Sequence, residues 1–177
     1  MTRFRLVSLL LLSFAFLPQA KAQVGLYGGF TASKLGASNS NWFYGPTLGA
    51  YYDPVHLPVL SFGFDARVAI LRSGSQPSTK VESGMIGPRV SLHLPVIPLR
   101  PYGEVLVGAA HIQAGQGAAS SSSTHGGVGA AAGIDLTFFP RLDWRVVEYS
   151  YSHFTGPSGD NNQQTLTTGL VFRLPIP

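Results

Sequence analysis

The chain has 177 residues, no cysteine and only 20 charged residues, where a soluble domain usually has about a quarter. The lack of cysteine excludes a disulfide-rich secreted scaffold. After residue 22 no apolar run reaches the roughly 20 residues of a membrane helix, so a helical membrane protein is excluded as well.

The N-terminus has the features of a secretory signal peptide. Arg3 and Arg5 precede an apolar run over residues 6–17, and Ala20 and Ala22 place small residues at a cleavage site before Gln23. The run is short for a membrane anchor, which is the alternative. We therefore expect a signal peptide over residues 1–22 and one domain over 23–177. That domain holds nine basic and eight acidic residues, which leaves no basic patch for nucleic acid.

Eight segments of the domain alternate between apolar and small or polar residues, as β-strands with two different faces do. In chain order they cover residues 24–32, 42–52, 60–72, 81–94, 101–113, 126–154 (a hairpin of two strands) and 164–174. Pro46 and Pro88 weaken the hydrogen-bond ladder of the second and fourth segments, and a β-bulge could accommodate each proline.

The two faces differ in a way that favours a barrel with lipid outside. The polar side is mostly Gly, Ala, Ser and Thr with single charges, which suits a narrow lumen, while the apolar side carries Tyr and Phe near the strand ends. A soluble sandwich would also alternate, with its apolar face inward. The residues that we expect to face lipid are Phe62, Phe64, Val105, Val107, Ile134, Leu136, Tyr149, Leu170 and Phe172.

The connections also alternate in kind. Those over residues 53–58, 95–101 and 140–142 are short and rich in proline, and those over 33–41, 73–80, 115–124 and 156–163 are longer and rich in Gly, Ser and Asn. Outer-membrane barrels have short periplasmic turns and longer outer loops, so both termini are expected on the periplasmic side. The serine tract at 120–124 is predicted to be a flexible loop and residues 160–162 a turn. Adhesion through these two loop segments is an alternative, but their residues do not indicate a particular extracellular ligand.

The chain resembles the OmpA-like family of eight-stranded outer-membrane β-barrels, in its small single-domain form. Residues 24–30, 100–104, 127–138 and 144–151 carry the resemblance. It implies an all-β, antiparallel, up-and-down transmembrane barrel in the outer membrane of a Gram-negative-type cell, with outer-membrane lipid and the barrel-assembly machinery as partners. Such barrels usually end on an aromatic residue that the insertion machinery reads. This chain departs from that pattern, because Phe172 is followed by Arg173-Leu174-Pro175-Ile176-Pro177.

The charged residues of the polar face come from six strands. An eight-stranded barrel has an interior that side chains just fill, and an unpaired buried charge costs several kcal/mol. We therefore expect a salt-bridged lumen plug; a narrow conduction path and a catalytic carboxylate are the alternatives. The residues concerned are Asp65, Arg67, Arg89, Glu104, Asp135, Glu148 and Arg173.

No catalytic, metal or cofactor site is predicted. The five histidines lie in five separate segments without metal-ligand spacing. A barrel enzyme that modifies lipid A would need a histidine beside a serine, but His153 falls on the face opposite Ser150, Ser152 and Glu148. The expected role is therefore structural, surface-interacting or pore-forming. The alternatives are a lipid A-modifying enzyme and a soluble lipocalin-like carrier of an apolar ligand.

Overall fold

The computed structural model describes residues 23–36, 42–73, 79–94, 97–115, 121–156 and 161–175. The predicted signal peptide and the last two residues lie outside these ranges. Within them there is no helix of the length and apolarity needed to cross a membrane.

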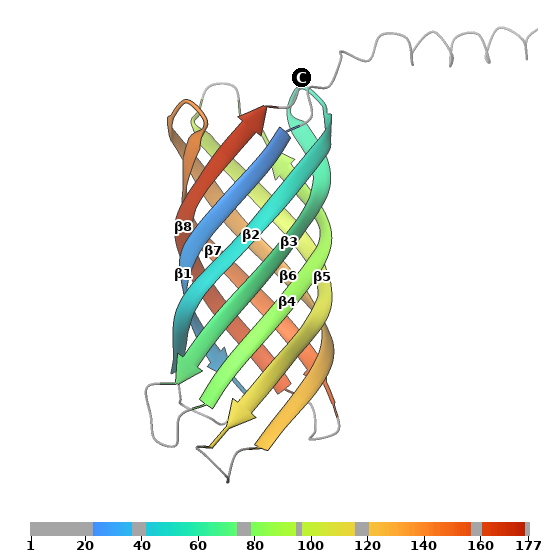
Figure 1. Ribbon diagram of the computed structural model, residues 1–177. Coiled ribbons are helices and arrows are strands. Elements are labelled where there is room, and N and C mark those ends of the chain that lie inside the picture. The colour runs from blue at the N-terminus through green and yellow to red at the C-terminus, as the bar shows by residue number, and fades with distance from the viewer. Residues whose placement is uncertain are drawn as a thin grey trace, which may run out of the picture.

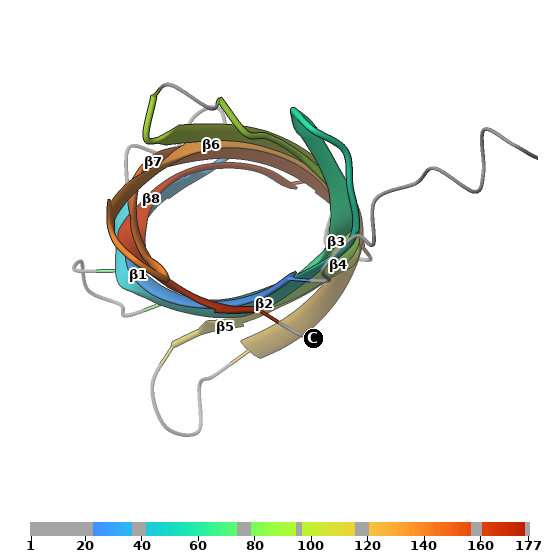
Figure 2. The same cartoon turned by 90° about the horizontal axis from the view of Figure 1, so that it is seen from above.

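Eight antiparallel strands form a closed barrel in which each strand pairs with its neighbours in the sequence and β1 pairs with β8 (Figures 1 and 2). The predicted all-β, eight-stranded, up-and-down fold is confirmed. The strands are β1 (Gln23–Leu35), β2 (Trp42–His56), β3 (Leu60–Ser73), β4 (Thr79–Leu92), β5 (Leu99–Ala114), β6 (Ser121–Phe139), β7 (Leu142–Thr155) and β8 (Asn161–Pro175).

The strands are longer than the sequence indicates, and the difference lies mainly at one end of the barrel. Ser121 pairs with Ala114, so the second part of the serine tract belongs to β6 and is not a loop. Asn161 and Asn162 likewise pair with β7 as the start of β8. Serine, threonine and asparagine hydrogen-bond through their backbone as any residue does, and a paired neighbour is enough to extend the strand. At 13–19 residues, the strands exceed the roughly 9–11 needed to cross a bilayer.

The two strand prolines are accommodated without a bulge. The register of β2 with its neighbours is unbroken through Pro46, and that of β4 is unbroken through Pro88. A glycine precedes each proline, and it lets the neighbouring strand come close. A Cβ on Gly45 would lie 1.9 Å from the carbonyl oxygen of Ile70, and one on Gly87 would lie 1.8 Å from that of Val105.

The bulges that do occur change which side chains face the lumen. One lies between Tyr52 and Val55 in β2, and another lies in β7, where the register with β8 shifts between Arg145 and Glu148. Because successive strand residues point to opposite faces, one extra residue reverses the alternation. Arg145 and Glu148 are therefore both buried inside, although their spacing of three would place them on opposite faces of a regular strand.

The close approach of β4 and β5 makes a testable distinction between two glycines of one strand. Gly87→Ala is expected to destabilise the barrel by about 1–3 kcal/mol, because its methyl group meets the backbone of Val105. Gly84→Ala should be nearly neutral, since its Cβ meets only Val68 Cγ1 at 4.0 Å. Urea unfolding in micelles measures both. Equal midpoints for the two variants would contradict the close packing.

Candidate functional site

The lumen is filled near its middle by ionised side chains that reach inward from five strands. Asp65 and Arg67 come from β3, Arg89 from β4 and Glu104 from β5. β6 and β7 complete the set from the other side of the barrel. Each of these charged side chains is less than a tenth exposed, so their partners decide whether the arrangement is stable.

Three arginines and three carboxylates form a closed ring of alternating charge. Arg67 contacts Glu148 through Nη1 at 2.5 Å and Glu104 through Nη2. Arg89 joins Glu104, at 2.8 Å, to Asp135, at 3.4 Å. Arg145 then joins Asp135, at 3.1 Å, back to Glu148, at 2.9 Å. Each carboxylate of the ring therefore contacts two arginines, which satisfies charges that burial would otherwise penalise.

Three tyrosines support this ring, here called the charge ring. The hydroxyl of Tyr27 donates to Asp65 Oδ1 at 2.8 Å, and Asp65 in turn accepts from Arg67 Nε at 2.9 Å. The hydroxyl of Tyr102 donates to Glu148 Oε2 at 2.6 Å. The arginines also stack on tyrosine rings: the guanidinium of Arg89 lies 4.0 Å from the centre of Tyr102 and 4.2 Å from that of Tyr51. Such cation–π contacts favour a desolvated guanidinium.

Arg173 belongs to a separate cluster nearer the C-terminal end of the barrel. Its Nη2 donates to Asp143 Oδ1 at 2.8 Å, and Arg100 Nη1 lies 3.7 Å from the same carboxylate. Of the seven charges predicted for the lumen, the structure thus joins six through contacts within hydrogen-bond range. It places the seventh with Asp143 and Arg100, which the sequence analysis did not select.

A second group of side chains lies inside the barrel toward the other end. Beyond the charge ring there is a polar cavity of only about 40 Å³, with Thr31, Thr47 and Thr167 among its lining. Farther along, the buried side chains of Phe43, Leu71 and Val81 pack together, with Leu35 and Ile112 against them. Apolar side chains from β1 to β5 therefore gather inside the barrel beyond the charged layer.

The outer wall carries the large apolar side chains. Eight of the nine residues predicted to face lipid are at least 38% exposed there, from Ile134 at 38% to Val105 at 61%, and Leu136 is half-buried. Aromatic residues gather near the strand ends, where the rings of Trp42 and Phe30 each stack on Tyr44 with centroids 6.3 Å apart. This distribution is the inverse of a water-soluble protein.

Sequence reasoning missed Arg145 and the role of the tyrosines. Alternation alone puts Tyr27 and Tyr51 on the polar face, so their inward position could have been read as a sign of a cation partner. No such sign exists for Arg145, because its inward position depends on the bulge in β7.

Serine and histidine meet twice, in each case without a carboxylate to orient the histidine among the described residues. Ser123 Oγ lies 2.9 Å from His125 Nε2, and Ser61 Oγ lies 3.3 Å from His93 Nδ1. The serine and histidine considered from the sequence do not meet: Ser152 contacts Met85 Sδ at 3.7 Å, and His153 Nδ1 lies 2.6 Å from Asn162 Oδ1. Within the described ranges there is also no group of three His, Cys, Asp or Glu residues that could hold a metal ion.

Comparisons with known proteins agree with this architecture. The family model described as "Outer membrane protein beta-barrel domain" matches residues 6–173. The crystal structure of Neisserial surface protein A is 18% identical, with a TM-score of 0.59, and the alignment covers 88% of this chain and 97% of that one. The crystal structure of Ail, the attachment invasion locus protein of Yersinia pestis, is 16% identical, with a TM-score of 0.61 and coverage of 87% and 99%. At these identities the likeness extends to the fold alone. No curated protein matches the chain.

Removing one member of the charge ring should destabilise the barrel strongly. Arg145→Ala leaves Asp135 and Glu148 each short of one arginine partner inside the lumen, and the expected loss is about 3–5 kcal/mol. Arg72→Ala removes an exposed arginine and is the matched control. Urea unfolding in micelles tests the pair, and equal midpoints would show that the ring does not contribute to stability.

His93 makes stability depend on pH. It lies just beyond the end of β4, where burial, reinforced by the positive charges of Arg100 and Arg173, lowers the pKa of its imidazole to about 4. Unfolded histidine titrates near pH 6.5, so between about pH 6.5 and 4 the unfolded chain binds more protons and stability falls as the pH is lowered. The urea midpoint should drop less between neutral and mildly acidic pH in His93→Gln than in the native protein. The same drop in both proteins would contradict this assignment.

Proposed function

We propose that this chain, which belongs to the outer membrane protein beta-barrel domain family, forms a closed integral barrel with a structural or surface-interaction role. Membership places the protein in the outer membrane. We further propose that the protein belongs to a Gram-negative-type cell and that the signal peptide at residues 1–22 directs its export. The barrel-assembly machinery then inserts it, and outer-membrane lipid surrounds it.

The charge ring is the observation that carries this proposal. An open pore needs a continuous water-filled path, but Arg67, Arg89 and Arg145 are each held by two or more carboxylates across the lumen. An ion that passed through would have to displace these contacts and then pass the apolar side chains of Phe43, Leu71 and Val81. A closed barrel is therefore better supported than a narrow pore.

The outer wall supports the placement in lipid. Large apolar side chains such as Phe64, at 59% exposure, and Val105, at 61%, would be costly in water but cost nothing in hydrocarbon. A soluble carrier of an apolar ligand would need the reverse, with apolar side chains inside and charges outside. The arrangement of this barrel argues against that alternative.

We further propose that the barrel is not an enzyme. A hydrolase that acts on lipid needs a serine activated by an oriented histidine on a surface that the lipid can reach. His125 is 1% exposed inside the barrel, and Glu148 is already bound to Arg67, Arg145 and Tyr102. The serine–histidine contacts of the described chain are thus better explained as structural hydrogen bonds.

Planar-bilayer recording tests the closed lumen. The native protein, refolded and inserted into a bilayer in concentrated KCl, is expected to give no conductance steps above those of the bare membrane, because the charge ring occupies the lumen. Heat-modifiable mobility on a gel serves as the control that the protein used is folded. Discrete steps from the folded native protein would overturn the closed-barrel proposal in favour of the narrow pore.

A further inference from the structure

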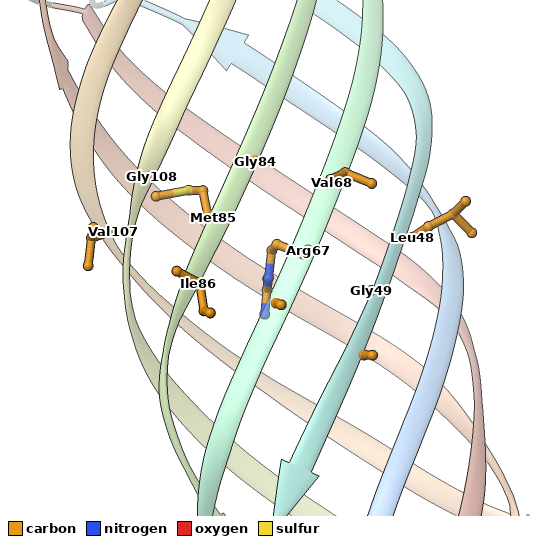
Figure 3. A pocket seen from close by; sticks show the side chains of 11 residues that line it. Leu48, Gly49, Arg67, Val68, Gly84, Met85, Ile86, Val107 and Gly108 are labelled. Atoms are coloured by element: carbon orange, nitrogen blue, oxygen red, sulfur yellow. The ribbon is translucent and has the colours of Figure 1, made fainter.

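The outer wall is not uniform, because a groove of about 600 Å³ runs over β2 to β5 (Figure 3). Ala50, Ala66 and Gly84 are among its lining, and the larger side chains of Val68 and Ile86 stand beside them. A Cβ built on Gly84 has only Val68 Cγ1 within 4 Å, at 4.0 Å, so the groove is open at this point. A hollow of this kind on an apolar wall can receive a hydrocarbon chain.

Two cations face each other beyond one end of the groove. Arg72 of β3 and Lys80 of β4 are directly opposite in the strand register. Like charges in this position repel each other, and one nearby carboxylate, that of Glu82, interacts with both cations. Lys80 Nζ lies 2.6 Å from Glu82 Oε1, whereas among the described residues Arg72 has no carboxylate within ion-pair distance. Residues 74–78, which connect the two strands, include no acidic residue in the sequence.

The cation pair also lines a pocket of its own. This pocket is about 280 Å³, and Thr79 and Gln113 contribute polar side chains beside Arg72 and Lys80. Guanidinium and ammonium groups together bind phosphate well, the first through its fork of N–H donors and the second as a compact charge. The pocket therefore suits a phosphate group.

The pocket and the groove lie on the same strands at a distance that suits one lipid molecule. Val68 borders the groove and Arg72 follows four residues later on the same face of β3, which separates them by roughly 13 Å. Half the hydrocarbon thickness of a bilayer is about 15 Å. A lipid chain that lies in the groove would thus bring its headgroup near the cation pair. Trp42 and Tyr44 stand at the same end of β2, as interfacial aromatic residues do.

We infer that Arg72 and Lys80, with the groove over β2 to β5, form a binding site for one phosphate-bearing lipid of the outer leaflet. The phosphate lies between the two cations, and an acyl chain of the same molecule lies along Val68, Gly84 and Ile86. This inference rests on the proposed placement of the barrel in a bilayer. It adds a preferred lipid at one defined side of the wall.

The two tryptophans provide a direct measurement. Trp42 lies near the cation pair, and Trp144 lies in β7 at the opposite end of the barrel. The fluorescence of Trp42 is measured in the Trp144→Phe variant, and that of Trp144 in the Trp42→Phe variant. The barrel is refolded into phosphatidylcholine vesicles that contain increasing fractions of a lipid brominated high in its acyl chains, which quenches tryptophan emission on contact. Brominated phosphatidic acid is compared with brominated phosphatidylcholine.

Trp42 should report a relative association constant above one in favour of phosphatidic acid. Arg72→Gln and Lys80→Gln should each lower this preference about fivefold, since a cation near an anionic lipid surface contributes about that factor. The double variant should show no preference. Gly84→Leu, which fills the groove, should also lower the preference although it removes no charge.

Matched controls separate these effects from general ones. Gly103→Leu adds the same side chain to β5 outside the groove, where a Cβ has only the Ala131 carbonyl oxygen within 4 Å, at 3.9 Å, and should leave the preference unchanged. Arg141→Asn removes a cation from the turn between β6 and β7 and should also leave it unchanged. Heat-modifiable mobility verifies that each variant is folded.

The outcomes distinguish this inference from the proposal on which it rests. Equal quenching of Trp42 by both lipids in the native sequence, or an unchanged preference in the double variant, would overturn the lipid site while leaving the barrel in its bilayer. A preference that survives Gly84→Leu would overturn the role of the groove and with it the composite site. If no brominated lipid quenches either tryptophan, the placement in a bilayer itself is wrong.

Discussion

The closed ring of Arg67, Glu104, Arg89, Asp135, Arg145 and Glu148 is the constraint on which the rest of the structure depends. An ionised side chain that leaves water loses several kcal/mol of solvation, and a single partner seldom restores it. In a ring of alternating sign each charge has two opposite neighbours, so no member is left half-compensated. Its members come from five strands, β3 to β7, which ties the register on one side of the barrel to that on the other.

The ring also explains why the apolar residues lie where they do. Charges and tyrosines fill much of the lumen, the apolar clusters inside the described part of the barrel are small, and Phe64, Val105 and Leu170 lie on the outer wall. Hydrocarbon solvates that wall, so the bilayer takes the place that a hydrophobic core has in a soluble domain. The exception is the inner cluster around Phe43 and Leu71, which lies beyond the ring.

The extension of the strands past the membrane-spanning length determines what the protein presents outside. Loops such as the serine tract were expected to form that surface, but Ser121 and the residues after it continue β6 as paired strand. Arg72 and Lys80 likewise stand on paired strands, directly opposite each other. A rigid strand holds two cations opposite each other, which a mobile loop would allow to separate.

The sequence by itself determined the barrel, because the period of two in apolar residues and the number of segments admit few other folds. It also selected five of the six ring members, since Arg67, Arg89, Glu104, Asp135 and Glu148 all fall on the polar side of that alternation. Only the tertiary structure decided that Arg145 completes the ring and that Arg173 does not. Arg145 points inward because of the bulge in β7: one additional residue reverses the direction of every side chain beyond it, and pairing with neighbouring strands, not local composition, determines where that residue is placed. Arg173 is outside the ring because its position along β8 brings it to Asp143 instead.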